Sequence, residues 1–279
     1  MRKLFILGVA FIVSVAMLLT ACKKDESNNN SNNNTENPGG GNQEDPPTTG
    51  VIPNAVSDID GNSYDAQVWM AENLRTTKYA DGTIIPLGTT LDIPELSYTE
   101  PYRYTPGYNQ SNEENMTNVA YYGYLYNWPA VIHEASSSES NPSHVQGICP
   151  TGWHVPSDVE WTQLTDYVSS HSQYVCGDNN NSIAKALAST TGWYSSTETC
   201  VVGNAPHSNN ATGFSAFPAG YYNYFYGYND GFGSGAYFWS ATDDNGINAY
   251  GRCLLYDYAF VLRSDGDKCL GLSVRCVRD

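Results

Sequence analysis

The fold is decided by the stretch GICPTGWHVPSDVEW, residues 147–161, which contains the clearest helix start in the chain. Ser157 and Glu160 have the spacing of a capping box, and Asp158 suits the positive end of the helix dipole. Apolar residues then recur at helical spacing at Trp161, Leu164 and Val168. This pattern predicts a helix over residues 158–170.

Downstream of this helix, the chain predicts one more short helix and then mainly strands. The second helix is expected over residues 182–189, and the residues expected to face inward are Ile183, Ala186 and Leu187. Beyond Phe214 the chain is rich in glycine and aromatic residues in alternating segments, which predicts strands and tight loops.

Upstream, two Asp-Gly pairs mark turns. Asp60-Gly61 predicts a hairpin whose second strand holds Val68, Trp69 and Met70, and Asp81-Gly82 predicts a turn before Ile84 and Ile85. Residues 87–119 show little periodicity, so we expect them to run over the surface.

The composition excludes one large class of partner. The 279 residues include 13 Lys plus Arg against 29 Asp plus Glu, giving a net charge of −16. Nucleic acids are bound by clustered basic residues, so we expect no nucleic acid partner. Aromatic residues make up 13% and charged residues only 15%, which favours strands and loops over a helical bundle.

The N-terminal segment has the pattern of a targeting signal. Arg2 and Lys3 precede an apolar run over residues 4–19, which is too short to span a membrane but suits a signal-peptide core. The sequence LTAC that ends at Cys22 resembles a bacterial lipobox, which implies that residues 1–21 are a lipoprotein signal peptide and that Cys22 carries the lipid, palmitate among its acyl chains. The alternative is an ordinary secretory signal followed by an incidental cysteine.

Residues 22–50 are expected to form a tether between the lipidated cysteine and a domain at residues 51–279. The charged cluster at residues 23–26 resembles the surface-export signal of Bacteroidetes lipoproteins, although it could also be the solvated start of a linker. Residues 27–50 are almost wholly polar residues, glycine and proline, and cannot bury enough apolar surface to fold. We therefore expect an outer membrane lipoprotein that is exposed on the cell surface.

Six cysteines follow Cys22, and an even number in an exported chain points to disulfides. Fifteen pairings are possible. We expect Cys253 to pair with Cys269 across a hairpin and Cys176 with Cys200 around the second helix, which leaves Cys149 with Cys276. Partial reduction or a metal site is the alternative, but no Cys-x-x-Cys spacing favours zinc.

Several motifs occur in an order that resembles one protein family. They are WMAENLRTTKYADGTIIP (69–86), YYGYLYNW (121–128), GICPTGWHVPSDVEW (147–161), ATGFSAFPAGYY (211–222), AYFWSAT (236–242) and GLSVRCVRD (271–279). Together they resemble the Fibrobacter succinogenes major paralogous domain over roughly residues 54–279. This resemblance implies an exported bacterial protein and does not define an activity.

VPSDVEW and LSVRC are also distantly similar to motifs of the formylglycine-generating enzymes, a branch of the C-type-lectin-like fold. This similarity implies a loop-rich α+β domain with two helices and short antiparallel strands, and it supports the Cys149–Cys276 pair because such domains commonly join their two ends. The oxidase branch uses two closely spaced cysteines in its late strands. Cys253 has no second cysteine so close, so that chemistry is not carried over.

The titratable residues do not form a catalytic or metal motif. The five histidines are scattered at His133, His144, His154, His171 and His207. Asp243, Asp244 and Asn245 provide neighbouring oxygen ligands that could hold calcium, as could Asn229 and Asp230. A plain acidic turn is the alternative, because no Glu-Pro-Asn or Gln-Pro-Asp motif accompanies them. We expect no other cofactor and no enzymatic activity.

Residues 221–239 hold ten aromatic residues, more than the buried face of a regular strand could take. Exposed rings stack on sugars and anchor protein interfaces, so Tyr224, Tyr226 and Tyr228 are the predicted ligand-binding residues. Phe238 and Trp239 are expected in the core, and packing of the whole segment in a loop-rich core is the alternative.

These patterns lead to the hypothesis of a surface lipoprotein whose extracellular domain binds a glycan or another protein in adhesion or recognition. Two other hypotheses remain open. The chain could be a structural subunit of a surface assembly, or an enzyme on the fold of the formylglycine-generating enzymes, although the chain carries no titratable pair or metal cluster that would suggest catalysis.

Overall fold

Helix α4 (Asp158–Ser170) begins and ends at the residues that the sequence predicts. The Ser157 hydroxyl accepts a hydrogen bond from the Glu160 backbone N–H, and the Glu160 carboxylate accepts one from the Ser157 N–H. This capping box satisfies donors that the first turn leaves unpaired. The residues predicted to face inward, Trp161, Leu164 and Val168, are buried.

The computed structural model describes four stretches of the chain, residues 67–88, 97–107, 116–223 and 228–279. The predicted signal peptide, Cys22, the tether and the Asp60-Gly61 turn lie outside these stretches. Among the described residues, no helix combines the length and the apolar character needed to cross a membrane.

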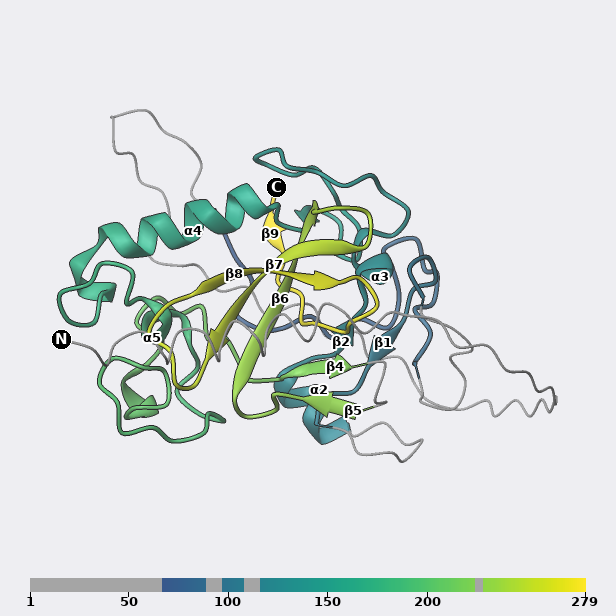
Figure 1. Ribbon diagram of the computed structural model, residues 1–279. Coiled ribbons are helices and arrows are strands. Elements are labelled where there is room, and N and C mark those ends of the chain that lie inside the picture. Colours follow the sequence, from purple (N-terminus) through teal and green to yellow (C-terminus); the bar gives the residue numbers. More distant parts are fainter. Residues whose placement is uncertain (1–66, 89–96, 108–115, 224–227) are drawn as a thin grey trace. The chain divides into compact units, whose positions relative to one another are not determined.

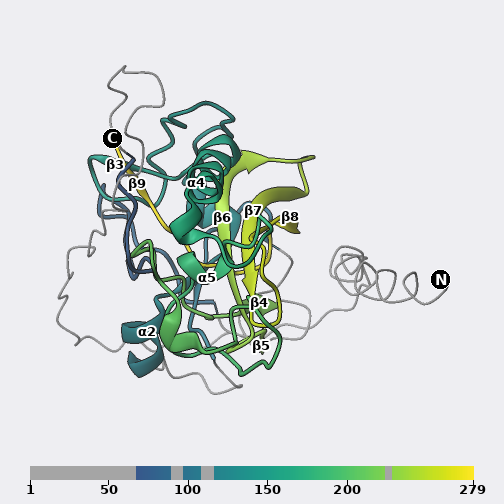
Figure 2. The same ribbon diagram turned by 90° about the vertical axis from the view of Figure 1, so that its left-hand side faces the viewer.

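Helix α4 packs against a three-stranded antiparallel sheet, and Figures 1 and 2 show the helix along one side of it. Its strands are β6 (Gly235–Asp243), β7 (Asn248–Leu255) and β8 (Leu262–Asp267). Each strand pairs with the next one in sequence, as expected for consecutive hairpins. The predicted succession of strands beyond Phe214 is confirmed.

The remaining strands form three short antiparallel pairs. β1 (Arg103–Tyr104) pairs with β2 (Leu125–Tyr126), β3 (Trp153–His154) with β9 (Val277–Arg278), and β4 (Tyr221–Asn223) with β5 (Tyr228–Asp230). The short helices are α2 (Met116–Tyr122), α3 (Trp128–Ile132), α5 (Ala184–Leu187), η1 (Ser172–Tyr174) and η2 (Pro206–Ser208). The structure is therefore a mixed α and β fold with few helices and short antiparallel sheets.

The C-terminal segment runs through the middle of the domain. Its backbone forms isolated bridges with four distant positions, at Trp69, Tyr126, Tyr222 and Phe238. Through these bridges it connects the first described segment to the β4–β5 pair and to the main sheet. The resulting core contains Trp69, Trp161, Phe214 and Phe238, with Trp69 and Trp161 centroids 4.6 Å apart. Phe238 and Trp239 are both fully buried, as predicted.

The guanidinium of Arg275 lies inside this core and satisfies backbone carbonyls that would otherwise be unpaired. It donates to the carbonyls of Met70 (2.7 Å), Phe214 (2.6 Å) and Ser215 (2.8 Å), and to Oδ1 of Asn73 (2.7 Å). Burial lowers the pKa of Arg275 to about 9. Arg275 therefore joins three segments that are distant in sequence.

Two of the three predicted disulfides are confirmed, Cys149–Cys276 and Cys176–Cys200. The prediction of a Cys253–Cys269 bond is wrong, and Cys253 is a buried thiol. The register explains why: Cys253 pairs with Leu262, whereas Cys269 follows Asp267, which pairs with Asn248. Asn248 and Cys253 are about 17 Å apart along an extended strand, far beyond disulfide reach.

The expectation of two helices is also wrong, because α2 and α3 form as well. In α3, the Asn127 side chain accepts from the Ala130 N–H and Pro129 occupies the first turn, so a local cap stabilises a helix of only five residues. α5 is shorter than predicted, because Ala188 is extended and forms a bridge with Ala216. Ile183, Ala186 and Leu187 are buried as expected.

Two predictions for the N-terminal part of the domain have different outcomes. The Asp81-Gly82 turn is confirmed. The Asp81 carboxylate accepts from the Thr83 N–H at 2.8 Å, and the backbones of Lys78 and Ile84 form an isolated antiparallel β-bridge across the turn. The described part of residues 87–119 does not simply run over the surface, because Tyr104 is only 2% exposed. Its ring stacks on Tyr222 with centroids 3.9 Å apart, which draws this segment into the fold.

Candidate functional site

In sequence, the predicted ligand-binding tyrosines follow β4 and reach into the start of β5. β4 ends at Asn223 and β5 starts at Tyr228, and these two residues are paired. Tyr224 and Tyr226 lie outside the described residues, and of Tyr228 only the backbone, within β5, is described. Their predicted role in binding is therefore still a prediction.

A group of aromatic rings lies beside this hairpin, around α2. We call it the α2 aromatic cluster, and its members are Tyr121, Tyr122, Phe217 and Phe232. Tyr121 contacts Tyr122 and Phe217 edge to face, at centroid distances of 4.7 and 5.1 Å. Tyr122 contacts Phe232 in the same manner at 4.8 Å. Tyr121 is 45% exposed, and the other three are partly buried.

The C-terminal end of α2 is fixed by side chains from outside the helix. Asn73 donates to the carbonyl of Tyr122 (2.8 Å), and Arg75 donates to that of Ala120 (2.9 Å). Gly123 then takes a left-handed conformation with φ of 76°, and a Cβ there would lie 2.7 Å from Asn73. The helix end that carries Tyr121 and Tyr122 is thus held by backbone contacts as well as by ring packing.

An open depression of about 750 Å³ lies along α2. The residues that line it are uncharged: Met116, Thr117, Asn118, Ala120, Tyr121 and Tyr122. Their side chains offer ring faces, hydroxyls and an amide, which are the groups that sugars contact through their apolar faces and hydroxyls. The sequence prediction placed the binding rings in residues 224–228 and missed these, although Tyr121 and Tyr122 stand in the motif YYGYLYNW.

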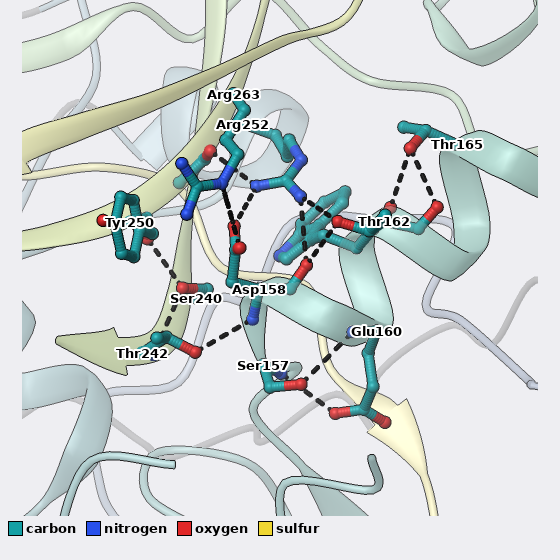
Figure 3. A network of polar contacts seen from close by, with 12 residues as sticks. Ser157, Asp158, Glu160, Thr162, Thr165, Ser240, Thr242, Tyr250, Arg252 and Arg263 are labelled. Carbon is teal, nitrogen blue, oxygen red and sulfur yellow. Dashed lines mark hydrogen bonds and ion pairs between the residues drawn. The ribbon is translucent and has the colours of Figure 1, made fainter. Parts of the chain in front are cut away.

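A polar network connects the N-terminus of α4 to the main sheet (Figure 3). The Asp158 carboxylate accepts from Arg252 at 2.5 Å and from Nε of Arg263 at 2.9 Å, and Arg252 also donates to Thr162 at 2.9 Å. Arg263 covers the ring of Tyr250, 3.8 Å from its centroid. Arg252 is buried, which lowers its pKa. Because these groups bind one another, the network is suited to fixing α4 on the sheet.

His154 is held through both of its ring nitrogens. Its Nε2 lies 2.8 Å from Oε1 of Glu160, and its Nδ1 lies 2.7 Å from Oδ1 of Asp279. The side chain is 3% exposed. Both ring nitrogens already have carboxylate partners, so the ring is not placed to exchange protons with a substrate.

The other histidines are dispersed. His133 stacks on Tyr79 with centroids 3.5 Å apart and lies 3.4 Å from the Asp81 carboxylate. His171 follows the last turn of α4, where its backbone N–H donates to the Val168 carbonyl and its Nδ1 lies 2.7 Å from the Tyr167 carbonyl. Within the described stretches, no three His, Cys, Asp or Glu residues are close enough together to hold a metal ion.

The proposed calcium ligands form a turn between β6 and β7 whose oxygens already accept hydrogen bonds. Asp243 binds the Lys268 ammonium at 3.0 Å and accepts from the Gly246 N–H at 2.7 Å. Asn245 donates to the Asp244 carboxylate at 2.9 Å. These contacts, with Lys268 among them, are those of an acidic turn. Calcium binding by Asp243, Asp244 and Asn245 is still a prediction.

The second calcium candidate, Asn229 with Asp230, is placed in β5. The Asp230 carboxylate accepts from the Tyr221 hydroxyl and the Gly231 N–H, and Asn229 donates to the carbonyl of Thr105 at 2.7 Å. These bonds fix the β4–β5 hairpin against the segment that precedes α2.

Comparison with known proteins identifies a family and nothing finer. The model of the Fibrobacter succinogenes major domain matches residues 63–278. No curated protein and no solved structure matches the chain.

Proposed function

The chain belongs to the Fibrobacter succinogenes major domain family, and from this premise we propose that it is a surface-anchored lipoprotein whose extracellular domain binds a glycan. The observation that carries the proposal is the α2 aromatic cluster, with Tyr121 45% exposed above a depression without charged lining. Rings held edge to face by neighbours present a stable apolar surface at little entropic cost on binding.

The predicted residues of the hairpin extend this proposal. Residues 224–227 connect β4 to β5, and Phe232 of the α2 aromatic cluster lies two residues after the end of β5. Tyr224, Tyr226 and Tyr228 therefore belong to the same region of the chain as the cluster, and we propose that they contribute to the same ligand site.

Lipidation of Cys22 and display on the outer face of the outer membrane are parts of the proposal that rest on the sequence. The LTAC motif and the polar residues 27–50 support a lipid anchor followed by a tether. A binding domain held away from the membrane by a tether would reach ligands outside the cell.

We also propose that the domain has the C-type-lectin-like fold. The pairing of the first described segment with the last supports this, because Trp69 forms a β-bridge with Val277 in β9, the strand that also pairs with β3. The Cys149–Cys276 disulfide adds a covalent bond at the residue that immediately precedes β9. A relation to the formylglycine-generating enzymes would place the chain in a branch of that fold without its oxidase chemistry.

Binding is favoured over catalysis by the state of the titratable groups. His154 is held between two carboxylates, and Asp158 between two arginines. A protein ligand or a structural role in a surface assembly is the second candidate, since exposed aromatic residues also anchor protein interfaces.

A glycan array probed with the exported protein, with and without calcium, tests the proposal. We expect binding to at least one glycan, weakened in the Tyr121→Ala variant and in the Tyr224→Ala, Tyr226→Ala and Tyr228→Ala variants, with little change in melting temperature. If calcium removal abolished binding and the tyrosine substitutions did not, the binding site would instead be the Asp243 turn. Absence of glycan binding together with concentration-dependent self-association would favour the assembly subunit.

A further inference from the structure

A second exposed ring, that of Tyr194, lies outside the α2 aromatic cluster. Tyr194 is 58% exposed, which is more than the exposed fraction of Tyr121. Its ring contacts Tyr256 edge to face, with centroids 5.9 Å apart. Gly233 lies directly against it, since a Cβ at Gly233 would be 2.7 Å from the Tyr194 ring. The Tyr194 ring is therefore supported from below and open on its other side.

Residues 191–194 connect this ring to the α2 aromatic cluster. The Thr191 hydroxyl is hydrogen-bonded to the hydroxyl of Tyr121, and the Tyr194 N–H donates to the carbonyl of Gly233 at 2.7 Å. Thr191 and Tyr194 are three residues apart, so their Cα atoms are at most about 11 Å apart. The exposed rings of Tyr121 and Tyr194 are thus joined through residues 191–194.

The underside of this surface is continuous as well. The Gly233 N–H donates to the carbonyl of Pro218 at 2.9 Å. Phe232 and Phe217, the residues before Gly233 and Pro218, are both members of the α2 aromatic cluster. This backbone hydrogen bond therefore connects the segment that contacts Tyr194 to the segment that contacts Tyr121.

The charges around this surface disfavour anionic ligands. The depression along α2 has an uncharged lining. Asp230 lies two residues before Phe232, and Asp257 follows Tyr256. Arg75, which donates to the C-terminal end of α2, is paired with Glu72 at 2.8 Å. The chain as a whole carries a net charge of −16, so its field repels polyanions.

We propose that the surface from Tyr121 to Tyr194 binds an uncharged polysaccharide, with several sugar units along the two exposed rings. This inference rests on the proposed glycan-binding function and specifies its ligand class as a neutral chain. Two exposed rings favour a chain over a single sugar, because only a ligand long enough to reach both rings can stack on both.

Native affinity electrophoresis of the full chain, purified in detergent, tests the charge requirement. The gels contain hydroxyethyl cellulose or carboxymethyl cellulose, which share one backbone and differ mainly in charge, and two further neutral and anionic pairs, galactan with polygalacturonate and mannan with alginate. We expect retardation by at least one neutral member and none by the anionic members. Equal or stronger retardation by an anionic member would overturn the neutral-ligand inference. Retardation by no polysaccharide would overturn the glycan-binding function itself, and the inference with it.

Titration with oligosaccharides of the retarding glycan tests the requirement for a chain. We expect affinity to rise with length from the monosaccharide, and Tyr121→Ala and Tyr194→Ala each to weaken binding of the long oligosaccharide about tenfold. Tyr194→Phe keeps the ring and should keep the affinity, which separates ring loss from misfolding. A monosaccharide that binds as tightly as the long oligosaccharide would overturn the inference.

Tyr250→Ala is the matched control variant, because Tyr250 lies at the other end of β7 from Tyr256 and its ring is covered by Arg263. We expect its affinity to equal that of the unaltered chain. If Tyr250→Ala weakened binding as much as Tyr194→Ala did, the placement of the ligand along Tyr121 and Tyr194 would be wrong.

Discussion

The imidazole Nε2 of His154 lies 2.8 Å from Oε1 of Glu160, six residues further along the chain, and both side chains are buried. Glu160 also accepts from the backbone N–H groups of Ser157 and Ser143. The same carboxylate thus completes the capping box of α4 and fixes the ring of His154. Asp279 holds the opposite ring nitrogen, so His154 couples α4 to the C-terminal segment.

The stability of the domain should fall as the pH rises through the folded-state pKa of His154. Burial acts to lower this pKa, but the hydrogen bonds and charges of Glu160 and Asp279 outweigh it and raise the pKa above the usual 6.5. The stabilisation is fully present below about pH 6.5 and is lost at higher pH. Thermal melts across this range should show a falling melting temperature that His154→Gln removes.

His207→Gln provides the control for this titration, because His207 is exposed and belongs to η2, away from the carboxylates that hold His154. Its melting temperature should follow the same pH curve as the unaltered protein. A His154→Gln variant with an unchanged pH dependence would show that the coupling contributes nothing to stability.

The Cys149–Cys276 disulfide should stabilise the fold more than Cys176–Cys200. The two bonds span 127 and 24 residues. The chain-entropy model then gives about 5 and about 3.5 kcal/mol, respectively. We expect the Cys149→Ser/Cys276→Ser pair of substitutions to lower the free energy of unfolding more than Cys176→Ser/Cys200→Ser, as measured in urea. The reverse order would mean that native-state contacts, rather than loop closure, set the contribution.

Local signals in the sequence were sufficient for α4 and insufficient for the strand register. The capping box of α4 involves residues three apart, so Ser157 and Glu160 predict its start without any tertiary information. The Cys253–Cys269 prediction failed because it required the pairing frame of β7 with β8. That frame depends on which residues each strand buries and on the length of the turn, and a shift of a few residues separates two cysteines by many ångströms.

The candidate site could be predicted only in part, for a similar reason. The density of aromatic residues in 221–239 correctly indicated buried Phe238 and Trp239. The α2 aromatic cluster combines rings from residues 121–122, 217 and 232, which tertiary packing brings together. α2 has seven residues and only one buried side chain, Val119, so its sequence carries almost no helical periodicity.

The thiol of Cys253 should be unreactive in the folded protein. Burial raises its pKa to about 11, and a thiolate is the species that reacts with disulfide reagents. We expect no labelling of Cys253 by a thiol reagent at neutral pH under native conditions, and rapid labelling in denaturant, as followed by peptide mass spectrometry. Rapid native labelling would contradict the placement of Cys253 within the sheet.

Lipidation at Cys22 predicts a specific biochemical phenotype. Because residues 19–22 resemble a lipobox, Cys22→Ala should abolish incorporation of labelled palmitate and leave the protein unprocessed or released. Metabolic labelling and membrane fractionation measure both effects. The Cys253→Ala variant serves as the control, since it removes a buried cysteine and should leave labelling unchanged. Normal acylation of the Cys22→Ala protein would remove the anchor from the proposed function.

Removal of the Asp158 carboxylate should lower the free energy of unfolding by more than the loss of an exposed ion pair would. Its carboxylate is 14% exposed and is shared by Arg252, which is 3% exposed, and Arg263, which is 50% exposed. Removing the carboxylate leaves the buried Arg252 charge without its counterion, which costs about 3–5 kcal/mol for buried pairs. Removing Arg263 breaks a pair that solvent already screens, which costs about 1 kcal/mol or less.

Urea unfolding of Asp158→Ala, Arg263→Ala and the double variant separates these contributions. We expect Asp158→Ala to be the more destabilising single substitution, and the coupling between Asp158 and Arg263 to be small in the double-mutant cycle. Thr162→Val removes another Arg252 partner while retaining the ion pair, and should cost about 1.5–3 kcal/mol, the value for a hydrogen bond to a charged group. If Arg263→Ala were as destabilising as Asp158→Ala, the exposed arginine rather than the buried one would be what holds α4 on the sheet.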